Sequence, residues 1–224
     1  MRPPSGAPRP PKLAAMILGQ IRPAITLLVV LTTITGVLYP VGMTLAAKAL
    51  FPRQSAGSLL IGDDGAVRGS LLIGQPFTGP GWFHGRPSAS GTTPYDPTSS
   101  GGSNFGPTSA AFTTLVAERA EALRRDESTG SATIPVDLVT ASASGLDPHI
   151  SPRAALLQVR RVAAARGLAD EQVQRLVAAR IEPAFLGILG RPRVNVLVLN
   201  LALESLDSGG AMPKLSEEGL RPPP

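Results

Sequence analysis

The sequence has no cysteine. This absence excludes a disulfide framework, a thiolate metal site and a cysteine nucleophile. Aromatic residues make up only 4% of the chain, with one Trp and two Tyr, so few rings are available to stack on nucleic-acid bases. The formal net charge is +5, but the basic residues are dispersed along the chain. The composition therefore argues against a nucleic-acid-binding protein.

An uncharged run near the N-terminus is the longest apolar feature of the chain. Arg22 and Lys48 bracket 25 residues, 23–47, that carry no charge. As a helix this run would be about 37 Å long, and the hydrocarbon core of a bilayer is about 30 Å thick. The run therefore predicts a transmembrane helix. A cleaved signal peptide is the alternative, but the apolar region of a signal peptide is usually shorter.

The charges around this run predict its orientation and the limits of the domains. Four basic residues precede it and only two follow closely, which predicts a cytoplasmic N-terminus at residues 1–22. An extracytoplasmic domain is then expected at residues 53–206. Residues 1–12 are rich in proline and arginine and are expected to be disordered. The tail at 207–224, which ends in Arg221-Pro222-Pro223-Pro224, is expected to be disordered as well.

The domain begins with a short repeat and a long loop. Residues 57–62 recur letter for letter at residues 69–74, and Asp64-Gly65 lies between the copies. This pattern predicts two strands of a hairpin. Residues 75–107 are rich in Gly, Pro, Ser and Thr but hold five aromatic residues. We therefore expect an ordered loop that turns its rings inward or against a partner.

Periodicity beyond the loop predicts an α/β mixed domain with a small β-sheet and about three helices. Helices are expected at residues 109–126, from Ser151-Pro152 to Gly167, and from a cap at Asp170 onward. A strand is expected at residues 134–140, where apolar residues alternate. The run 194–203 is apolar on both faces, which favours a buried central strand.

Candidate chemistry is sparse. Neither a P-loop nor a dinucleotide-binding turn is present in the sequence, and His84 and His149 show no metal-ligand spacing. Asp147, His149 and nearby serines could form a hydrolase triad, although a turn that leads into a capped helix is the favoured interpretation. Catalytic and metal residues are accordingly expected to be absent.

One glycine-rich loop could hold an anion. Ser100, Gly101, Gly102 and Ser103 precede a predicted helix, and backbone N–H groups at such a place can bind phosphate. A flexible turn or a protein contact is the alternative for this loop, and it is favoured.

Taken together, several motifs resemble one protein family. They are residues 69–75, Trp82-Phe83-His84-Gly85-Arg86-Pro87-Ser88, Tyr95-Asp96-Pro97, Ser100-Gly101-Gly102-Ser103-Asn104, residues 142–152, Gln158-Val159-Arg160-Arg161-Val162-Ala163 and residues 194–200. In order and content they resemble the C subunit of the Kdp potassium-transporting P-type ATPase, the KdpC family. The resemblance extends over about residues 57–203 and the membrane helix.

The resemblance implies a place in the plasma membrane of a bacterium, as a single-pass accessory subunit of a high-affinity potassium import complex. The expected partners are a potassium-channel-like subunit, a P-type ATPase catalytic subunit and the lipid bilayer. The family is described as a catalytic chaperone that raises the ATP affinity of the ATPase subunit and stabilises assembly. No cofactor is expected to bind this chain directly, because ATP and K+ are handled by the complex.

The resemblance also suggests site residues and leaves rival functions open. Trp82, Phe83, Arg86 and Asn104 are expected to contact a partner, and Ser100 to Ser103 are a weak candidate for nucleotide binding. The rival functions are a membrane-anchored extracytoplasmic hydrolase that uses His149 or His84 and an extracytoplasmic binding domain.

Overall fold

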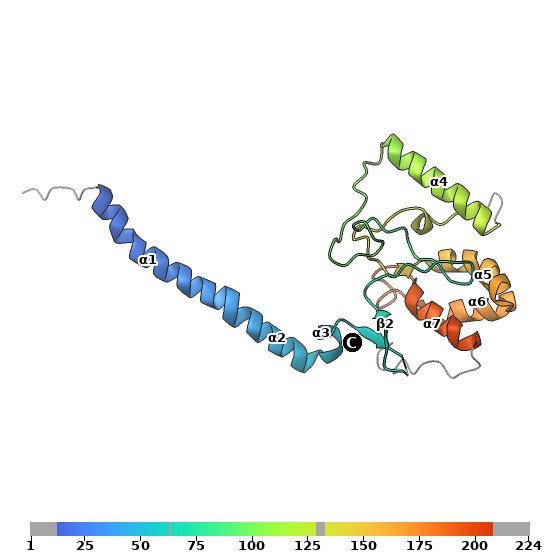
Figure 1. The fold of residues 1–224 in the computed structure, drawn as a ribbon, viewed down its shortest axis with the longest axis horizontal. Helices are drawn as coiled ribbons and strands as arrows, with labels where there is room; N and C mark the ends of the chain where they lie inside the picture. Colours follow the sequence, from blue (N-terminus) through green and yellow to red (C-terminus); the bar gives the residue numbers. More distant parts are fainter. Residues whose placement is uncertain (1–12, 63, 129–132, 208–224) are drawn as a thin grey trace, which may run out of the picture. The chain divides into compact units, whose positions relative to one another are not determined.

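The computed structural model describes residues 13–62, 64–128 and 133–207, and the disorder predicted at residues 1–12 and in most of the 207–224 tail falls outside them. The chain divides between Ala56 and Gly57 into an N-terminal helical unit and a compact domain (Figure 1). The two units are described separately.

The N-terminal unit is one long apolar helix. It consists of α1 (Leu13–Thr33), a π-helical turn η1 (Ile34–Leu38) and α2 (Tyr39–Leu50), followed by the short helix α3 (Pro52–Ser55). Within residues 18–50, an 18-residue window has a mean hydropathy of 2.0, and none of that window is buried within the structure. This helix is long and apolar enough to cross a membrane, and it contains the run predicted at 23–47.

The π-helical turn has a local cause in Pro40. Proline has no N–H and cannot donate to the carbonyl one turn earlier, so the regular hydrogen-bond ladder is interrupted there. Two hydroxyls satisfy carbonyls nearby: Thr35 Oγ1 donates to Leu31 O at 2.7 Å, and Thr44 Oγ1 donates to Pro40 O at 2.7 Å. These two hydroxyls are thus satisfied within the helix itself, which suits a lipid environment.

The domain begins with the hairpin that the repeat predicted. Strands β1 (Leu59–Ile61) and β2 (Val67–Ser70) pair antiparallel, with a bulge between Leu60 and Ile61. The second strand lies earlier than expected, because it starts in the connector and ends at Ser70. The two copies of the repeat therefore adopt different structures.

Three helices confirm the sequence analysis closely. They are α4 (Ala110–Asp126), α5 (Pro152–Arg166) and α6 (Asp170–Ala179). Ser109 and Ser151 cap α4 and α5 with their side chains, and Gly167 ends α5 in a left-handed conformation, φ +66°. Asp170 is the first helical residue of α6 rather than its cap, which is Ala169.

Two predicted strands differ from the structure. The strand at residues 134–140 is wrong, and the strand at 194–203 is right only for its first two residues. Residues 134–140 contain a 3-10 turn, η2 (Val136–Leu138), after Pro135. The Asp137 carboxylate there accepts from Ser151 N at 2.6 Å and so holds the start of α5. The run 194–203 forms only the end of β5 (Arg193–Asn195) and then helix α7 (Val196–Asp207). Asn195 begins that helix, because its Oδ1 accepts from Val198 N at 3.2 Å.

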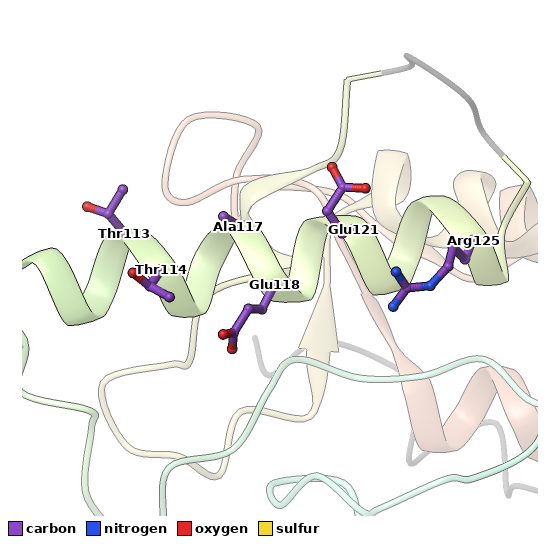
Figure 2. A pocket seen from close by; sticks show the side chains of 6 residues that line it. All are labelled: Thr113, Thr114, Ala117, Glu118, Glu121 and Arg125. Atoms are coloured by element: carbon purple, nitrogen blue, oxygen red, sulfur yellow. The ribbon is translucent and has the colours of Figure 1, made fainter.

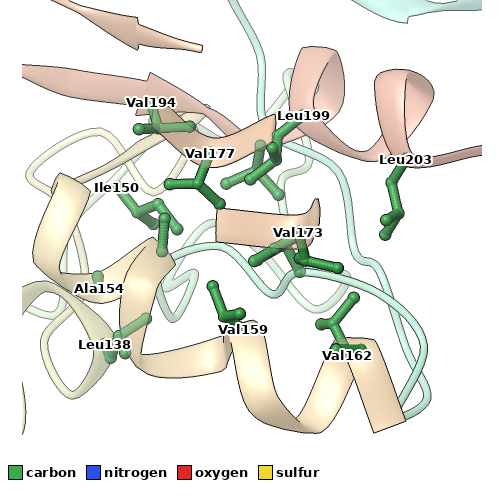
Figure 3. Packing of buried hydrophobic residues seen from close by; sticks show 14 residues of the cluster. Leu138, Ile150, Ala154, Val159, Val162, Val173, Val177, Val194, Leu199 and Leu203 are labelled. Carbon is green, nitrogen blue, oxygen red and sulfur yellow. The ribbon is translucent and has the colours of Figure 1, made fainter. Parts of the chain in front are cut away.

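A second small sheet and the helices around it form the core. Strand β5 pairs antiparallel with β3 (His149–Ile150) on one side and β4 (Ile181–Glu182) on the other. Apolar side chains of α5, α6, α7 and β5 converge on this sheet, among them Val159, Val173, Val177 and Leu199 (Figure 3). The mixed α/β class is therefore confirmed. Helix α7 is buried around most of its circumference, whereas α4 has no buried residue.

Candidate functional site

The long loop, residues 75–107, is the largest part of the domain without helix or strand, and it contains most of the predicted site residues. Its middle is nevertheless buried: Phe83 is 0% exposed, Ser90 2% and Tyr95 9%. Phe77 packs against the core, while Phe105 at the far end is 43% exposed. The prediction of an ordered loop with rings turned inward is confirmed for the middle of the loop.

Two buried side-chain amides hold the backbone of the loop. Asn200 of α7 accepts from Phe83 N and donates to Phe83 O, both at 2.9 Å. Gln158 of α5 accepts from His84 N at 2.7 Å and donates to His84 O at 3.1 Å. Both amides are 0% exposed. They replace the hydrogen bonds of a neighbouring strand and allow this irregular segment to cross the core with its polar groups satisfied.

Two arginines fix the segment just before Phe83. Arg161 of α5 donates to Pro80 O at 2.6 Å and to Trp82 O at 3.0 Å. Arg166 donates to Gly81 O at 2.6 Å, and its guanidinium lies 4.3 Å from the centre of the Trp82 ring. Trp82 also meets Phe77 at 5.6 Å between ring centres. Its indole is therefore half-buried between the loop and α5.

Arg161 also forms a buried ion pair that ties the end of α4 to α5. Its Nε donates to Glu127 Oε1 at 2.8 Å, and the two side chains are 9% and 1% exposed. Burial raises the pKa of Glu127, although the positive charge of Arg161 acts in the opposite direction. Glu127 Oε2 has no hydrogen-bond partner among the described residues. Loss of either partner would leave a charge buried alone, which costs about 3–5 kcal/mol.

Arg86 joins the long loop to the segment 140–148. Its Nη1 lies 3.2 Å from Asp147 Oδ2, and its Nη2 donates to Ala141 O at 3.2 Å. The hydroxyl of Tyr95 donates to Arg86 O at 2.6 Å. Burial, together with the nearby Asp147 charge, raises the pKa of Tyr95 to about 12. Tyr95 therefore acts as a neutral hydrogen-bond donor under all physiological conditions.

Asp147 is also held by the histidine that follows it. Burial alone would raise the pKa of Asp147, but hydrogen bonds from His149 and the charges of His149 and Arg86 outweigh burial and lower it. His149 Nδ1 lies 3.3 Å from Asp147 Oδ1. Two of the serines near His149 have structural partners: Ser151 Oγ accepts from Ala154 N as a helix cap, and Ser144 Oγ accepts from Leu146 N. This arrangement favours the turn interpretation.

The predicted glycine-rich loop packs directly on the same segment. Gly101 N donates to Ser144 O at 2.9 Å, and Ser100 Oγ donates to the same oxygen at 3.1 Å. Where the two loops cross, Gly145 has φ +69°, and a Cβ there would lie 2.7 Å from Gly101 O and from Ser90 N. Only glycine fits this crossing.

This packing restricts what the glycine-rich loop can bind. The N–H of Gly101 is already used, and Gly102 faces Ala143 O, which a Cβ would approach to 3.0 Å. The next helix starts at Ala110 with its own cap at Ser109, so Ser103 does not lie at a helix N-terminus. Nucleotide binding by residues 100–103 stays a prediction, and the geometry at Gly101 and Gly102 disfavours it.

The predicted partner-contact residues lie at different depths. Asn104 is exposed, and Trp82 is half-buried. The Arg86 side chain is 24% exposed. Phe83 is fully buried, so its side chain cannot reach a partner while the domain is folded. We therefore remove Phe83 from the candidate contact surface, and for the other three residues the contact stays a prediction.

A shallow cavity of about 540 Å³ lies on α4 (Figure 2). All six lining residues belong to this helix: Thr113, Thr114, Ala117, Glu118, Glu121 and Arg125. Since no second element contributes a side chain, no group of residues converges there as a binding site requires. Among the described residues, no cluster of three or more His, Asp or Glu is placed to hold a metal ion.

Sequence reasoning missed the residues that support the loop. Asn200 was assigned to a strand, and the roles of Gln158, Arg161 and Arg166 were not predicted. A signal was present for Asn200, because an amide in an otherwise apolar run must find a hydrogen-bond partner when buried. Its partner lies 117 residues away in the chain. No sequence pattern indicates that pairing.

Comparison with known proteins gives a consistent result. The family model described as KdpC, K+-transporting ATPase, c chain, matches residues 21–205. A "Potassium-transporting ATPase KdpC subunit" from Sorangium cellulosum is 55% identical over 188 residues, which cover 84% of this chain and 98% of that protein. Proteins of the same name from Polaromonas naphthalenivorans and Geobacter sulfurreducens are 56% and 52% identical, and the matches cover 94% and 98% of their lengths.

Replacing Asn200, whose amide binds the backbone N–H and C=O of Phe83, should destabilise the domain. In Asn200→Leu the N–H and C=O of Phe83 lose their partners inside the core, and we expect a loss of about 2–4 kcal/mol in the free energy of unfolding. Urea unfolding of the detergent-solubilised chain, followed by fluorescence of Trp82, the only Trp in the sequence, measures this loss. Gln174→Leu, which also replaces an amide by leucine but at an exposed position on α6, is the control and should change stability little. Equal stabilities of the two variants would contradict a stabilising role for the hydrogen bonds between Asn200 and Phe83.

Proposed function

The chain belongs to the KdpC family, the c chain of K+-transporting ATPase, and from this premise we propose that it is the membrane-anchored accessory subunit of an ATP-driven potassium importer. The observation that carries the proposal is the family match, which extends over residues 21–205 and includes the apolar helix as well as the domain. A single family match that covers both the apolar helix and the domain favours a permanent membrane subunit over a soluble factor.

We assign no reaction to this chain itself. The polar side chains of its motifs are engaged in holding the fold: Ser151 caps α5, Asp147 binds Arg86 and His149, and Gln158 binds the backbone of His84. Residues committed to such contacts are poorly placed to activate a nucleophile. In the proposed complex, a P-type ATPase subunit hydrolyses ATP and a channel-like subunit selects potassium.

We propose that the domain docks on the channel-like subunit through the exposed parts of the long loop. Trp82 is half-buried, and Arg166 and Phe77 already hold its ring in place. In the same loop, the Arg86 side chain is partly exposed and Asn104 is exposed. Trp and Arg are the residues that most often dominate binding energy at protein interfaces. A ring that is ordered before binding also loses little side-chain entropy when it docks.

We further propose that the chain acts as a catalytic chaperone without touching ATP. A subunit that binds one conformation of the ATPase better than another shifts the populations of the two conformations. A tenfold rise in ATP affinity needs a coupling free energy of only about 1.4 kcal/mol. The occupied N–H of Gly101 favours this indirect route over a phosphate site at residues 100–103.

The proposed location is the plasma membrane of a bacterium, with residues 1–22 in the cytoplasm and the domain outside. The excess of basic residues before the uncharged run supports this orientation. An outside location also agrees with an indirect effect on ATP, because the nucleotide site of an importing ATPase faces the cytoplasm.

Labelling of single cysteines tests the orientation. The chain has no cysteine of its own, so Thr113→Cys, at an exposed position on α4, introduces the only thiol. We expect this thiol to react with a membrane-impermeant maleimide added to whole cells. Ser5→Cys should react only after the cells are opened. The reverse pattern would show that the orientation is wrong.

Affinity purification from detergent tests the accessory-subunit proposal. The tagged chain should co-purify with two large membrane subunits, identified by mass spectrometry as a channel-like protein and a P-type ATPase. Trp82→Ala should reduce their recovery at least about tenfold, as expected for loss of one interface anchor of about 2 kcal/mol. Leu156→Ala removes an exposed apolar side chain from α5, outside the loop, and is the control.

The outcomes of this purification separate two explanations. Loss of the partners with an unchanged unfolding midpoint supports docking through Trp82. If the Trp82→Ala domain itself unfolds, the ring is structural and the contact surface lies elsewhere. If the wild-type chain brings down no P-type ATPase, the function proposed here is wrong.

Equilibrium titration with ATP tests the indirect route. The purified full-length chain should show no saturable binding of labelled ATP in the micromolar range, since Gly101 and Gly102 pack against the neighbouring loop. The same titration of the complex should show tighter ATP binding with this chain than without it. Micromolar binding by the chain alone that disappears in a Gly101→Val, Gly102→Val variant would instead establish a direct nucleotide contact.

A further inference from the structure

The loop between β4 and β5 exposes the most concentrated group of large apolar side chains in the described part of the domain. Phe185, Leu186, Ile188 and Leu189 are 47%, 76%, 80% and 59% exposed. They are consecutive apart from Gly187 and form the tip of a hairpin, which we call the apolar tip, residues 185–189. Exposed apolar residues are common singly, but a contiguous group of this size marks an interaction surface.

The backbone of the apolar tip is closed on itself. Phe185 N donates to Leu189 O and Leu189 N donates to Phe185 O, both at 2.9 Å. Gly187 N donates to Ala184 O at 2.9 Å and Ile188 N to Phe185 O at 3.2 Å. Insertion of a loop into lipid is costly when its N–H and C=O groups lack partners. Here four of the five N–H groups of residues 185–189 donate within the turn, which lowers this cost.

Basic residues flank the apolar tip in the sequence. Between positions 180 and 193 there are three arginines, Arg180, Arg191 and Arg193, against one acidic residue, Glu182. Arg193 is paired with Glu182 at 2.9 Å, and Arg191 is exposed. An apolar end with arginines behind it is the pattern of segments that lie in a membrane interface, with arginines near the lipid phosphates.

The connectivity of the chain keeps this domain near a bilayer. Only the eight residues 49–56 separate Lys48, at the end of the uncharged run, from the start of the domain at Gly57. Eight residues span at most about 28 Å even when fully extended. Asn195, at the end of β5, also donates to Leu71 O at 3.0 Å. The hairpin that carries the tip is therefore tied to the first segment of the domain after the anchor.

From these observations we propose that the apolar tip inserts into the interface of the bilayer from which the domain emerges. The lipid it fits is an anionic one, because the sequence that flanks the tip carries an excess of positive charge. The tip and the transmembrane helix would then hold the domain at two points and limit its rotation about the linker. This proposal rests on the anchor alone and holds for either orientation of the chain.

The composition of the tip favours lipid over a protein partner. Leu, Ile and Phe are the residues that enter a bilayer most favourably. Leucine is under-represented among the residues that dominate protein interfaces, where Trp, Tyr and Arg are enriched. The four tip side chains also offer no polar atom with which a protein partner could fix their orientation.

Fluorescence quenching in vesicles tests the proposal. Ile188→Cys carries an environment-sensitive NBD dye on the full-length chain, reconstituted in phosphatidylcholine and phosphatidylglycerol vesicles that contain nitroxide-labelled lipid. Glu171→Cys, at an exposed position on α6, is the control for general closeness to the membrane. We expect blue-shifted emission at position 188 and lipid quenching at least about twice that at position 171, as for a side chain buried at the headgroup boundary.

Two further variants separate the apolar and the electrostatic contributions. Leu186→Ser with Leu189→Ser should lower quenching at position 188 to the level at position 171, while Trp82 fluorescence stays unchanged because the core is intact. Arg191→Glu should weaken quenching in vesicles with phosphatidylglycerol and have little effect in pure phosphatidylcholine.

Two outcomes would overturn the proposal. One is equal quenching at positions 188 and 171 in every vesicle. The other is a probe that, in the purified complex with its partner subunits, is shielded both from nitroxide lipid and from iodide in the water. That second result would assign the apolar tip to a protein contact.

Discussion

Two buried amides determine the shape of the part of this domain that we expect to meet a partner. Asn200 and Gln158 bind both backbone groups of Phe83 and of His84, and they do so from two different helices, α7 and α5. A loop without helix or strand can cross a hydrophobic core only when its backbone is satisfied in this way. The position of the Trp82 ring, which directly precedes this segment, depends on these hydrogen bonds.

The other contacts of the loop extend the same arrangement outward. Arg86 joins the long loop to the segment 140–148 through Asp147, and Gly145 allows the two loops to cross at close range. The residues of the motifs that resemble the KdpC family are thus largely those that bind one loop to another. Their use in the fold explains how a polar, glycine-rich sequence can be rigid, and it fits a subunit that offers its partners a fixed surface.

Membrane attachment adds a second constraint on function. The linker of residues 49–56 limits how far the domain can lie from the apolar helix, and the proposed insertion of the apolar tip would add a second point of attachment. A domain restrained at two points presents its loop in a narrow range of orientations. Such preorganisation lowers the entropy that is lost on assembly with other membrane subunits.

The sequence by itself determined the features that depend on local chemistry. An uncharged run of 25 residues predicted the apolar helix, Ser109 and Ser151 predicted the helix starts, and Gly167 predicted a helix end, because each signal acts within a few residues. Tertiary structure alone decided that residues 196–207 form a helix, that 136–138 form a 3-10 turn and that Phe83 is core. These outcomes depend on partners far along the chain, such as Asn200 for Phe83, and a buried apolar run has no period that separates helix from strand.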